Sequence, residues 1–177
     1  MPKRVQFVVE GPSDKLLFDA IAPQLRRRGI SPTIVPALDR ARLIRDAPRH
    51  LRTAQRSLRT VSFVLDQDED RCPPQTAERL DEVRSQAGVT VCVAAREIEA
   101  WILADPFVEQ YLGRRNPRVG ILTDAIRDPK KELANLFFQK YHYMPTSTEA
   151  IKAVAAHFDL ARAQTRNASL ARFLRSL

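Results

Sequence analysis

The sequence is poor in cysteine and has no long apolar run, and both absences narrow the class of protein. Two of the 177 residues are cysteines, Cys72 and Cys92, and they form neither a metal-binding spacing nor a disulfide framework. We therefore expect two reduced, structural thiols in a cytoplasmic protein. No stretch approaches the roughly 20 apolar residues that a membrane-spanning helix needs. The start, MPKRVQF, leads into a strand without the apolar core of a signal peptide.

Histidine is also scarce, and acidic residues are outnumbered by basic ones. The three histidines, His50, His142 and His157, lie far in sequence from every acidic cluster, so we interpret them as ordinary surface or core residues. The 29 Lys and Arg against 21 Asp and Glu give a net charge of +8. Arginine dominates LRRRG, PRHLRTAQRSLR and LGRRNPR, and its planar guanidinium can bind phosphate through two parallel hydrogen bonds. This balance favours nucleic acid as a partner, although a GC-rich genome would give the same excess on solvated helix faces.

Strand-like and helix-like segments alternate through the first two thirds of the chain. Short apolar runs, RVQFVV, SPTIVPAL, TVSFVLD and VTVCVAA, are separated by longer stretches with helical spacing. This alternation predicts an α/β fold with a parallel sheet of about four strands and helices on both faces. We expect residues 1–112 to form this α/β domain and residues 113–177 to form a helical C-terminal extension packed on the same domain.

Acidic residues follow three of the four expected strands. They are Glu10 after the first strand, Asp66, Asp68, Glu69 and Asp70 after the third, and Glu97 and Glu99 after the fourth. In a parallel α/β sheet, ligands gather beyond the carboxyl ends of the strands. Like charges at one edge repel each other, and a divalent cation relieves this repulsion. Oxygen ligands without His or Cys favour Mg²⁺ or Mn²⁺ over zinc.

Each of these acidic segments also has a simpler interpretation. Glu10 alone can be a turn residue that caps the next helix, and DQDED alone is typical of a solvated loop. An EF-hand is excluded, because Arg71 replaces the required glycine and the twelfth position is Ala77. The combination of an apolar strand ending in Glu-Gly with another ending in Asp-x-Asp is what favours a site.

That combination, VVEGPSDK with FVLDQDED, resembles the Toprim domain of primases, topoisomerases and several nucleases. The Toprim motif is a Glu after the first strand and an Asp-x-Asp after the third, matched here by Glu10, Asp66 and Asp68. The segments REIEAWILADP, DPKKELANLF and NASLARFLRSL resemble the small Toprim-like bacterial proteins of the domain of unknown function 4276 family. The Toprim likeness covers the N-terminal α/β part, and the narrower likeness extends over nearly the whole chain.

The resemblance implies Mg²⁺-dependent phosphodiester hydrolysis of nucleic acid, DNA or RNA. It makes Asp66 and Asp68 metal ligands, and Glu10 a ligand or general acid/base. A second ion would need further carboxylates, for which Asp70, Glu97 and Glu99 are candidates. Residues two apart on a helix point to nearly opposite sides, whereas in a strand they share a face. We favour Glu99, which lies in the motif-like EAWILAD, over Glu97.

Basic and polar residues near expected helix starts extend this hypothesis. Lys15 follows the turn after Glu10, where it can bind phosphate or stabilise the transition state. We interpret Lys130 and Lys131 as solvated, with phosphate binding as the alternative. Backbone N–H groups around Ser169 can face an anion at the start of the last helix. We interpret Trp101 and Ile102 as core residues, with base stacking as the alternative. Asp105, before Pro106, is interpreted as a helix-ending turn residue, with metal binding as the alternative.

The length excludes two of the Toprim activities. Topoisomerases need a tyrosine nucleophile in a separate domain and primases need large partner domains, so a nuclease or a related phosphoryl transfer remains. The rival hypothesis is a non-catalytic or partner-activated subunit of an ATPase complex in a phage-defence or repair module. A third hypothesis is metal-dependent binding of a nucleotide at the acidic edge.

Overall fold

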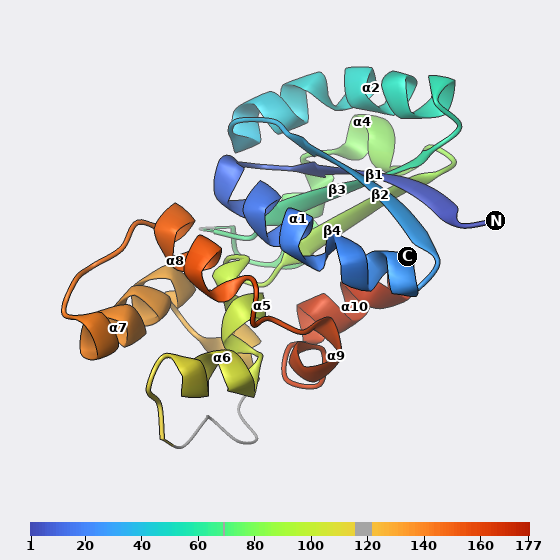
Figure 1. Ribbon diagram of the computed structural model, residues 1–177. Coiled ribbons are helices and arrows are strands. Elements are labelled where there is room, and N and C mark those ends of the chain that lie inside the picture. Colours follow the sequence, from blue (N-terminus) through green and yellow to red (C-terminus); the bar gives the residue numbers. More distant parts are fainter. Residues whose placement is uncertain (69, 116–121) are drawn as a thin grey trace.

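A single parallel sheet organises the computed structural model, which describes residues 1–68, 70–115 and 122–177 (Figure 1). Its strands are β1 (Lys3–Val9), β2 (Ile30–Pro36), β3 (Thr60–Asp66) and β4 (Val89–Ala94), in the order β2-β1-β3-β4. All three pairings are parallel. The central strands, β1 and β3, are the most buried of the four, as expected for parallel strands that are covered on both faces. This arrangement confirms the α/β fold with four parallel strands.

Helices cover both faces of the sheet, as Figure 1 shows. Those of the first half are α1 (Pro12–Arg27), α2 (Arg40–Arg56), α3 (Pro73–Glu78), α4 (Asp81–Arg84), α5 (Glu99–Leu103) and α6 (Pro106–Tyr111). A short 3₁₀ helix (Thr123–Ala125), α7 (Pro129–Tyr141), α8 (Ser147–Val154), α9 (Leu160–Ala163) and α10 (Ala168–Ser176) follow. On one face α2 and α4 pack on Val8, Phe63 and Leu65, and on the other α1 and α10 pack on Phe7 and Val9. Alternate side chains of one strand thus enter two separate cores.

Four aromatic rings form the centre of the core on the α1 side. Phe7 and Phe18 have ring centroids 5.2 Å apart, and Trp101 stacks on Phe173 at 5.2 Å. Phe18 also meets Phe173 edge-on at 5.7 Å, so β1, α1, α5 and α10 share one cluster. Trp101 is fully buried, and its indole N–H donates to Ser169 Oγ at 2.9 Å. The interpretation of Trp101 as a core residue is confirmed.

The N-terminus of α10 is capped from within the chain. Asp124 Oδ2 accepts from the backbone N–H of Ala168 at 2.6 Å, and Asp124 Oδ1 accepts from that of Ser169 at 3.3 Å. Asn167 Oδ1 accepts from the backbone N–H of Leu170 at 2.8 Å. Because these N–H groups are already satisfied, the expected anion site around Ser169 is wrong.

Asn167 gives a prediction about stability. Its fully buried side chain also donates to Thr123 Oγ1 at 2.9 Å and accepts from Ser169 Oγ at 2.7 Å. We expect Asn167→Ala to lower the free energy of unfolding by about 2–4 kcal/mol, because it removes a helix cap and leaves buried partners unsatisfied. Urea unfolding measures this loss, and Asn135→Ala, at an exposed position of α7, is the control. Equal stability of the two variants would contradict the structural role of Asn167.

The structure places both cysteines and bears on the lack of long apolar segments. Cys72 is an exposed free thiol and Cys92 a buried one. Burial raises the pKa of Cys92 to about 12, so this thiol is protonated and unreactive at neutral pH. Within the described ranges, none of the helices combines the length and the apolarity that crossing a membrane requires.

Candidate functional site

The carboxyl ends of β1 and β3 bring two predicted site residues together. Glu10 follows β1 directly, and Asp66 is the last residue of β3. Since these strands are parallel neighbours, both residues lie at the same edge of the sheet. Glu10 Oε1 accepts a hydrogen bond from the backbone N–H of Asp66 at 2.9 Å. The adjacency that the strand pattern predicts is therefore present.

The carboxyl group of Asp66 is the most unusual group at this edge. It is only 8 % exposed and has the acidic side chains of Asp14, Glu10, Glu99 and Asp68 around it. Burial, and then the negative charge of these four neighbours, raise the pKa of Asp66 well above its usual range. Three stretches of the chain, after β1, after β3 and at the start of α5, thus place carboxylates around one buried acid.

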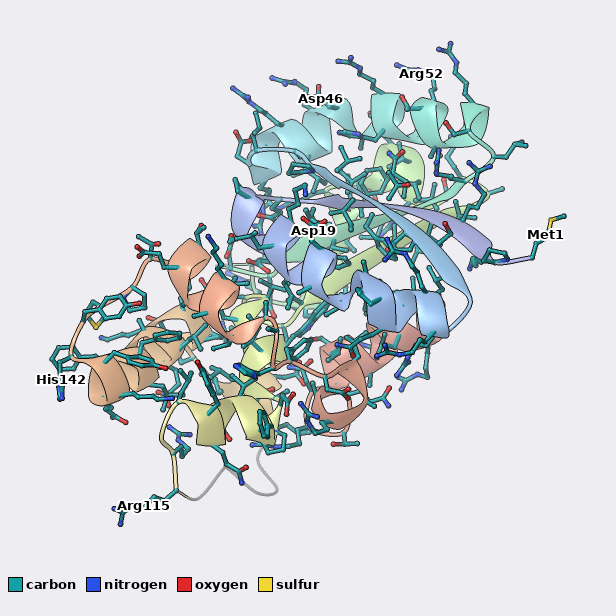
Figure 2. The ribbon with its side chains drawn as sticks, in the orientation of Figure 1. Met1, Asp19, Asp46, Arg52, Arg115 and His142 are labelled. Carbon is teal, nitrogen blue, oxygen red and sulfur yellow. The ribbon has the colours of Figure 1, made fainter. Side chains whose placement is uncertain are left out.

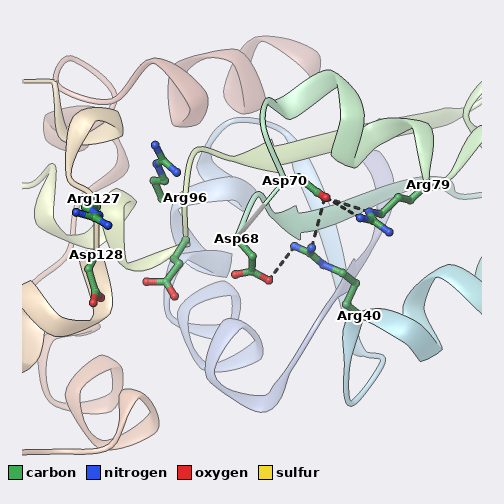
Figure 3. Close-up of a pocket in the computed structure, with 8 residues that line it drawn as sticks. Arg40, Asp68, Asp70, Arg79, Arg96, Arg127 and Asp128 are labelled. Atoms are coloured by element: carbon green, nitrogen blue, oxygen red, sulfur yellow. Dashed lines mark hydrogen bonds and ion pairs between the residues drawn. The ribbon is translucent and has the colours of Figure 1, made fainter.

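A residue that the sequence did not single out, Arg40, neutralises part of this charge. Arg40 begins α2, and its Nε lies 3.1 Å from Glu10 Oε1. Its Nη2 lies 3.0 Å from Asp68 Oδ2 and also donates to the carbonyl oxygen of Asp66, while Nη1 lies 3.5 Å from Asp70 Oδ2. Figure 3 shows this guanidinium between the two aspartates. Arg40 therefore holds Glu10 and Asp68 in one arrangement.

No ready-made metal site accompanies this arrangement. Among the residues that the structure describes, no group of three or more Asp, Glu, His or Cys side chains is placed to hold a metal ion. At this edge the acids do not converge on a common point, because the guanidinium of Arg40 lies between Glu10, Asp68 and Asp70. Coordination of Mg²⁺ or Mn²⁺ by the predicted ligands stays a prediction.

Asp70 is paired with a second arginine. Arg79 donates to both its oxygens, from Nε at 3.0 Å and from Nη2 at 2.6 Å. The hydrogen bond from Arg79 is the main reason that the pKa of Asp70 falls to about 2. Asp70 is thus held as an anion by arginine at the rim of the site, and Glu69 lies outside the described residues.

The two glutamates after β4 lie on neither a strand nor a common helix face. The strand ends at Ala94, Glu97 lies in the connection, and Glu99 begins α5. Glu97 accepts from Lys130 twice, from the backbone N–H at 3.0 Å and from Nζ at 3.1 Å. Burial by itself lowers the pKa of Lys130, but the charges of Glu99 and Glu97 outweigh it and raise that pKa. Lys130 is exposed and paired with Glu97 beside the acidic group, and phosphate binding by this lysine stays a prediction.

Glu99 is nearly inaccessible, with 1 % of its surface exposed. In the described part of the chain, neither of its carboxylate oxygens has a hydrogen-bond partner. Burial raises the pKa of Glu99, and the positive charge of Lys130 opposes this shift. A buried acid with unsatisfied oxygens is costly unless something else binds it.

Helix α1 presents Asp14 to the site and turns Lys15 away from it. Lys15 Nζ lies 2.5 Å from Asp19 Oδ2, one turn further along the exposed side of α1. Asp14 is buried beside Asp66, and its Oδ2 accepts from the backbone N–H of Gly11 at 3.0 Å. Burial raises the pKa of Asp14 above its usual value. The structure does not bring the predicted Lys15 to the acidic group and supplies an acid in its place.

Two adjoining pockets open over this edge of the sheet. A shallow one of about 220 Å³ is lined by Glu10, Gly11, Ser13, Asp14, Leu38, Asp39, Arg40, Asp66 and Lys130. A larger one of about 650 Å³ is lined by Arg40, Asp68, Asp70, Arg79, Arg96, Glu97, Arg127 and Asp128 (Figure 3). Arg40 lines both pockets, so the acidic residues of the smaller pocket and the arginines of the larger one form a continuous surface. Such a surface can bind a phosphate ester and place it against carboxylates.

The chain has no match among protein-family models, curated proteins or solved structures. The likeness to the Toprim domain and to the domain of unknown function 4276 family therefore stays a prediction. It depends on the residues that carry the motif, Glu10, Asp66 and Asp68.

Proposed function

We propose that this protein hydrolyses phosphodiester bonds of nucleic acid in a reaction that depends on Mg²⁺ or Mn²⁺. The observation that carries the proposal is the buried carboxyl group of Asp66 with four acidic neighbours at the end of a central strand. Four arginines line the pocket beside it, and their planar guanidinium groups suit phosphate. Together these support a reaction in which the carboxylates bind a cation and the arginines bind a phosphate.

The donor set fits a hard divalent cation. All the donors are oxygens, and the acids Asp66 and Glu99 are too buried for water to screen their charge. Asp66 and Asp68 would hold the ion, with Glu97 and Glu99 as further acids for a second one, while Glu10 beside them would act as the general acid or base. When bound, such a metal neutralises phosphate charge and lowers the pKa of a water molecule.

The chain's own residues then have separate tasks. Arg79, Arg96 and Arg127 bind the phosphates of the nucleic acid at the rim of the larger pocket. Burial raises the pKa of Glu10, and the charge of Arg40 opposes that shift. A carboxyl group whose pKa is shifted towards neutral pH is suited to transfer a proton. Arg40 keeps this carboxyl group directed into the site.

Glu10→Gln tests the proposal directly. We expect the rate of cleavage to fall by about 10²-fold or more, because the amide cannot transfer a proton as the carboxyl group does. Pure protein is incubated with single- and double-stranded DNA and RNA in Mg²⁺, Mn²⁺ or EDTA. Asp46→Asn is the matched control, since Asp46 lies half-buried beside Arg45 on the outer side of α2 and points away from the sheet (Figure 2). Cleavage that survives unchanged in Glu10→Gln protein would identify a contaminant.

The same experiment separates the proposal from its rival. Stabilisation of the fold by Mn²⁺ without any cleavage would favour the partner-activated subunit of an ATPase complex in a phage-defence or repair module. Both cysteines are free thiols, which supports a cytoplasmic setting for either function.

A further inference from the structure

The far end of α7 carries an exposed aromatic surface that the acidic edge does not use. In the described part of the chain, the exposed large aromatic side chains are Phe107, Phe138, Tyr141 and Tyr143, each 41–50 % exposed. Met144 beside them is 58 % exposed. An exposed apolar patch of this kind marks a binding surface. Figure 2 places His142, in the middle of it, at the end of the molecule away from Asp46 and Arg52.

The two tyrosines rest on a ring of the core. Helix α7 ends at Tyr141, and His142 takes a left-handed conformation with φ of 60°. This turn brings Tyr143 back over buried Phe137, with ring centroids 6.5 Å apart, while Tyr141 lies 5.7 Å from the same ring. Tyr141 and Tyr143 are themselves 6.4 Å apart. Both rings are therefore held in place before any ligand arrives, which lowers the entropic cost of binding.

The ammonium group of Lys140 lies among these rings. Lys140 Nζ is 3.9 Å from the ring centroid of Tyr111 and 4.9 Å from that of Tyr141. The tyrosine hydroxyls of Tyr111 and Tyr141 are 3.4 Å apart, and the Tyr111 ring lies 4.1 Å from that of His157. The aromatic surface thus continues from the end of α7 onto α6, with an exposed ammonium group between the rings.

The charge of the surface indicates the kind of ligand. Residues 133–148 contain no Asp or Glu and include Lys140, and Glu149, which follows them, accepts hydrogen bonds from Thr146 at 2.8 and 2.9 Å. The nearest acid of α7, Glu132, is bound to Arg114 at 2.5 Å. A surface of flat rings and cations without free acids is complementary to a polyanion with exposed aromatic faces. Single-stranded nucleic acid has such faces, whereas a duplex stacks its bases inside.

We propose that Tyr141 and Tyr143, with Lys140 beside them, stack the unpaired bases of single-stranded nucleic acid. This deepens the proposed function and rests on it, since it names the single strand as the substrate class. Lys130, at the acidic edge, and Tyr141 are eleven residues apart on α7. That spacing corresponds to about 16 Å along the helix, so one strand can contact both.

The test measures binding in EDTA by fluorescence anisotropy, with labelled single-stranded DNA and RNA oligonucleotides and a duplex of equal length. The variant Tyr141→Leu/Tyr143→Leu removes the stacking faces but keeps apolar side chains on Phe137. We expect it to bind the single strands at least about tenfold more weakly, since stacking contributes about 1–3 kcal/mol per base, and to bind the duplex as the wild type does.

Two controls make the result specific. Tyr141→Phe/Tyr143→Phe keeps both rings and should bind as the wild type does. Leu58→Ala changes an exposed apolar residue between α2 and β3, at the opposite end of the strands, and should also bind normally. Thermal melting confirms that each variant is folded at the temperature of the titration.

Three results would overturn the proposal. They are no binding of single strands by the wild type, unchanged binding by the Leu variant, or equal loss in the Phe variant. A wild-type dimer that the Leu variant dissociates, with no oligonucleotide bound, would show an interface between copies instead. The wild-type protein separates the two proposals: a single strand that it binds through these tyrosines but never cleaves in Mg²⁺ or Mn²⁺ would contradict the proposed hydrolysis and leave the stacking of bases intact.

Discussion

Asp66→Asn protein should lose metal-dependent cleavage of nucleic acid by at least about a thousandfold. A metal ion at a phosphoryl site contributes several kcal/mol of transition-state stabilisation, and each 1.36 kcal/mol is a factor of ten in rate. Asp66 is the buried acid that the other carboxylates surround, so its loss removes the central ligand of the proposed metal site. Single-turnover cleavage with saturating Mn²⁺ measures the loss, and Asp46→Asn is the control. Activity within tenfold of the wild type would contradict a metal site at Asp66.

The same substitution should stabilise the metal-free protein. The pKa of Asp66 is raised in the folded state by burial and by four acidic neighbours, above the ordinary value of 3.8. The folded state therefore binds this proton more tightly, and stability is lost as the pH rises from 3.8 through the raised pKa. Asn carries no charge at any of these pH values, so Asp66→Asn avoids the loss.

Thermal melts in EDTA between pH 4 and pH 8 measure this effect. At pH 8 we expect the variant to melt higher than the wild type by about 3 °C or more, since 1 kcal/mol corresponds to about 2–4 °C at this chain length. Near pH 4 the two should converge. Mn²⁺ should raise the melting temperature of the wild type and not of the variant. A variant that melts below the wild type in EDTA at pH 8 would contradict the charge repulsion at this edge.

The sequence predicted the parts of the site that depend on strand ends. Glu10 and Asp66 terminate apolar runs, and parallel pairing carries both to one edge whatever the strand order. Asp14, Arg40 and Lys130 depend on how helices from three separate segments are placed over that edge. With 29 Lys and Arg in the chain, no local pattern distinguishes Arg40 from the others.

Helix rotation explains the failure at Lys15. Successive helical residues differ by about 100° around the axis, so Asp14 and Lys15 cannot both face the sheet edge. The apolar stripe of α1 decides between them, because burial of Leu17, Phe18 and Ile21 turns Asp14 inwards. Glu97 and Glu99 show the same limit, since a turn between β4 and α5 fits neither the strand nor the helix that local pattern offered.

Away from the site, Asp105 holds the C-terminal helices to the α/β part. It is fully buried, and each of its two carboxylate oxygens accepts two hydrogen bonds. Arg162 donates to Oδ1 at 2.8 Å and to Oδ2 at 2.7 Å. The backbone N–H groups of Phe107 and Asp159 donate at 2.9 and 2.8 Å. Asp105 is thus the N-cap of α6, as its interpretation as a turn residue expected, and its oxygens are engaged by donors of the chain.

Asp105→Ala should therefore destabilise the protein more than any substitution at the acidic edge. Removing one partner of a buried ion pair costs about 3–5 kcal/mol, which corresponds to a fall in melting temperature of about 6–20 °C at this chain length. Asp81→Asn, which removes one partner of the exposed pair with Arg84, is the control and should cost less than about 1 kcal/mol. Below its melting temperature, Asp105→Ala protein should cleave nucleic acid at the wild-type rate, because Asp105 contacts no residue of the acidic edge. A loss of stability no greater than that of Asp81→Asn would show that α6 and α9 are held by their apolar contacts alone.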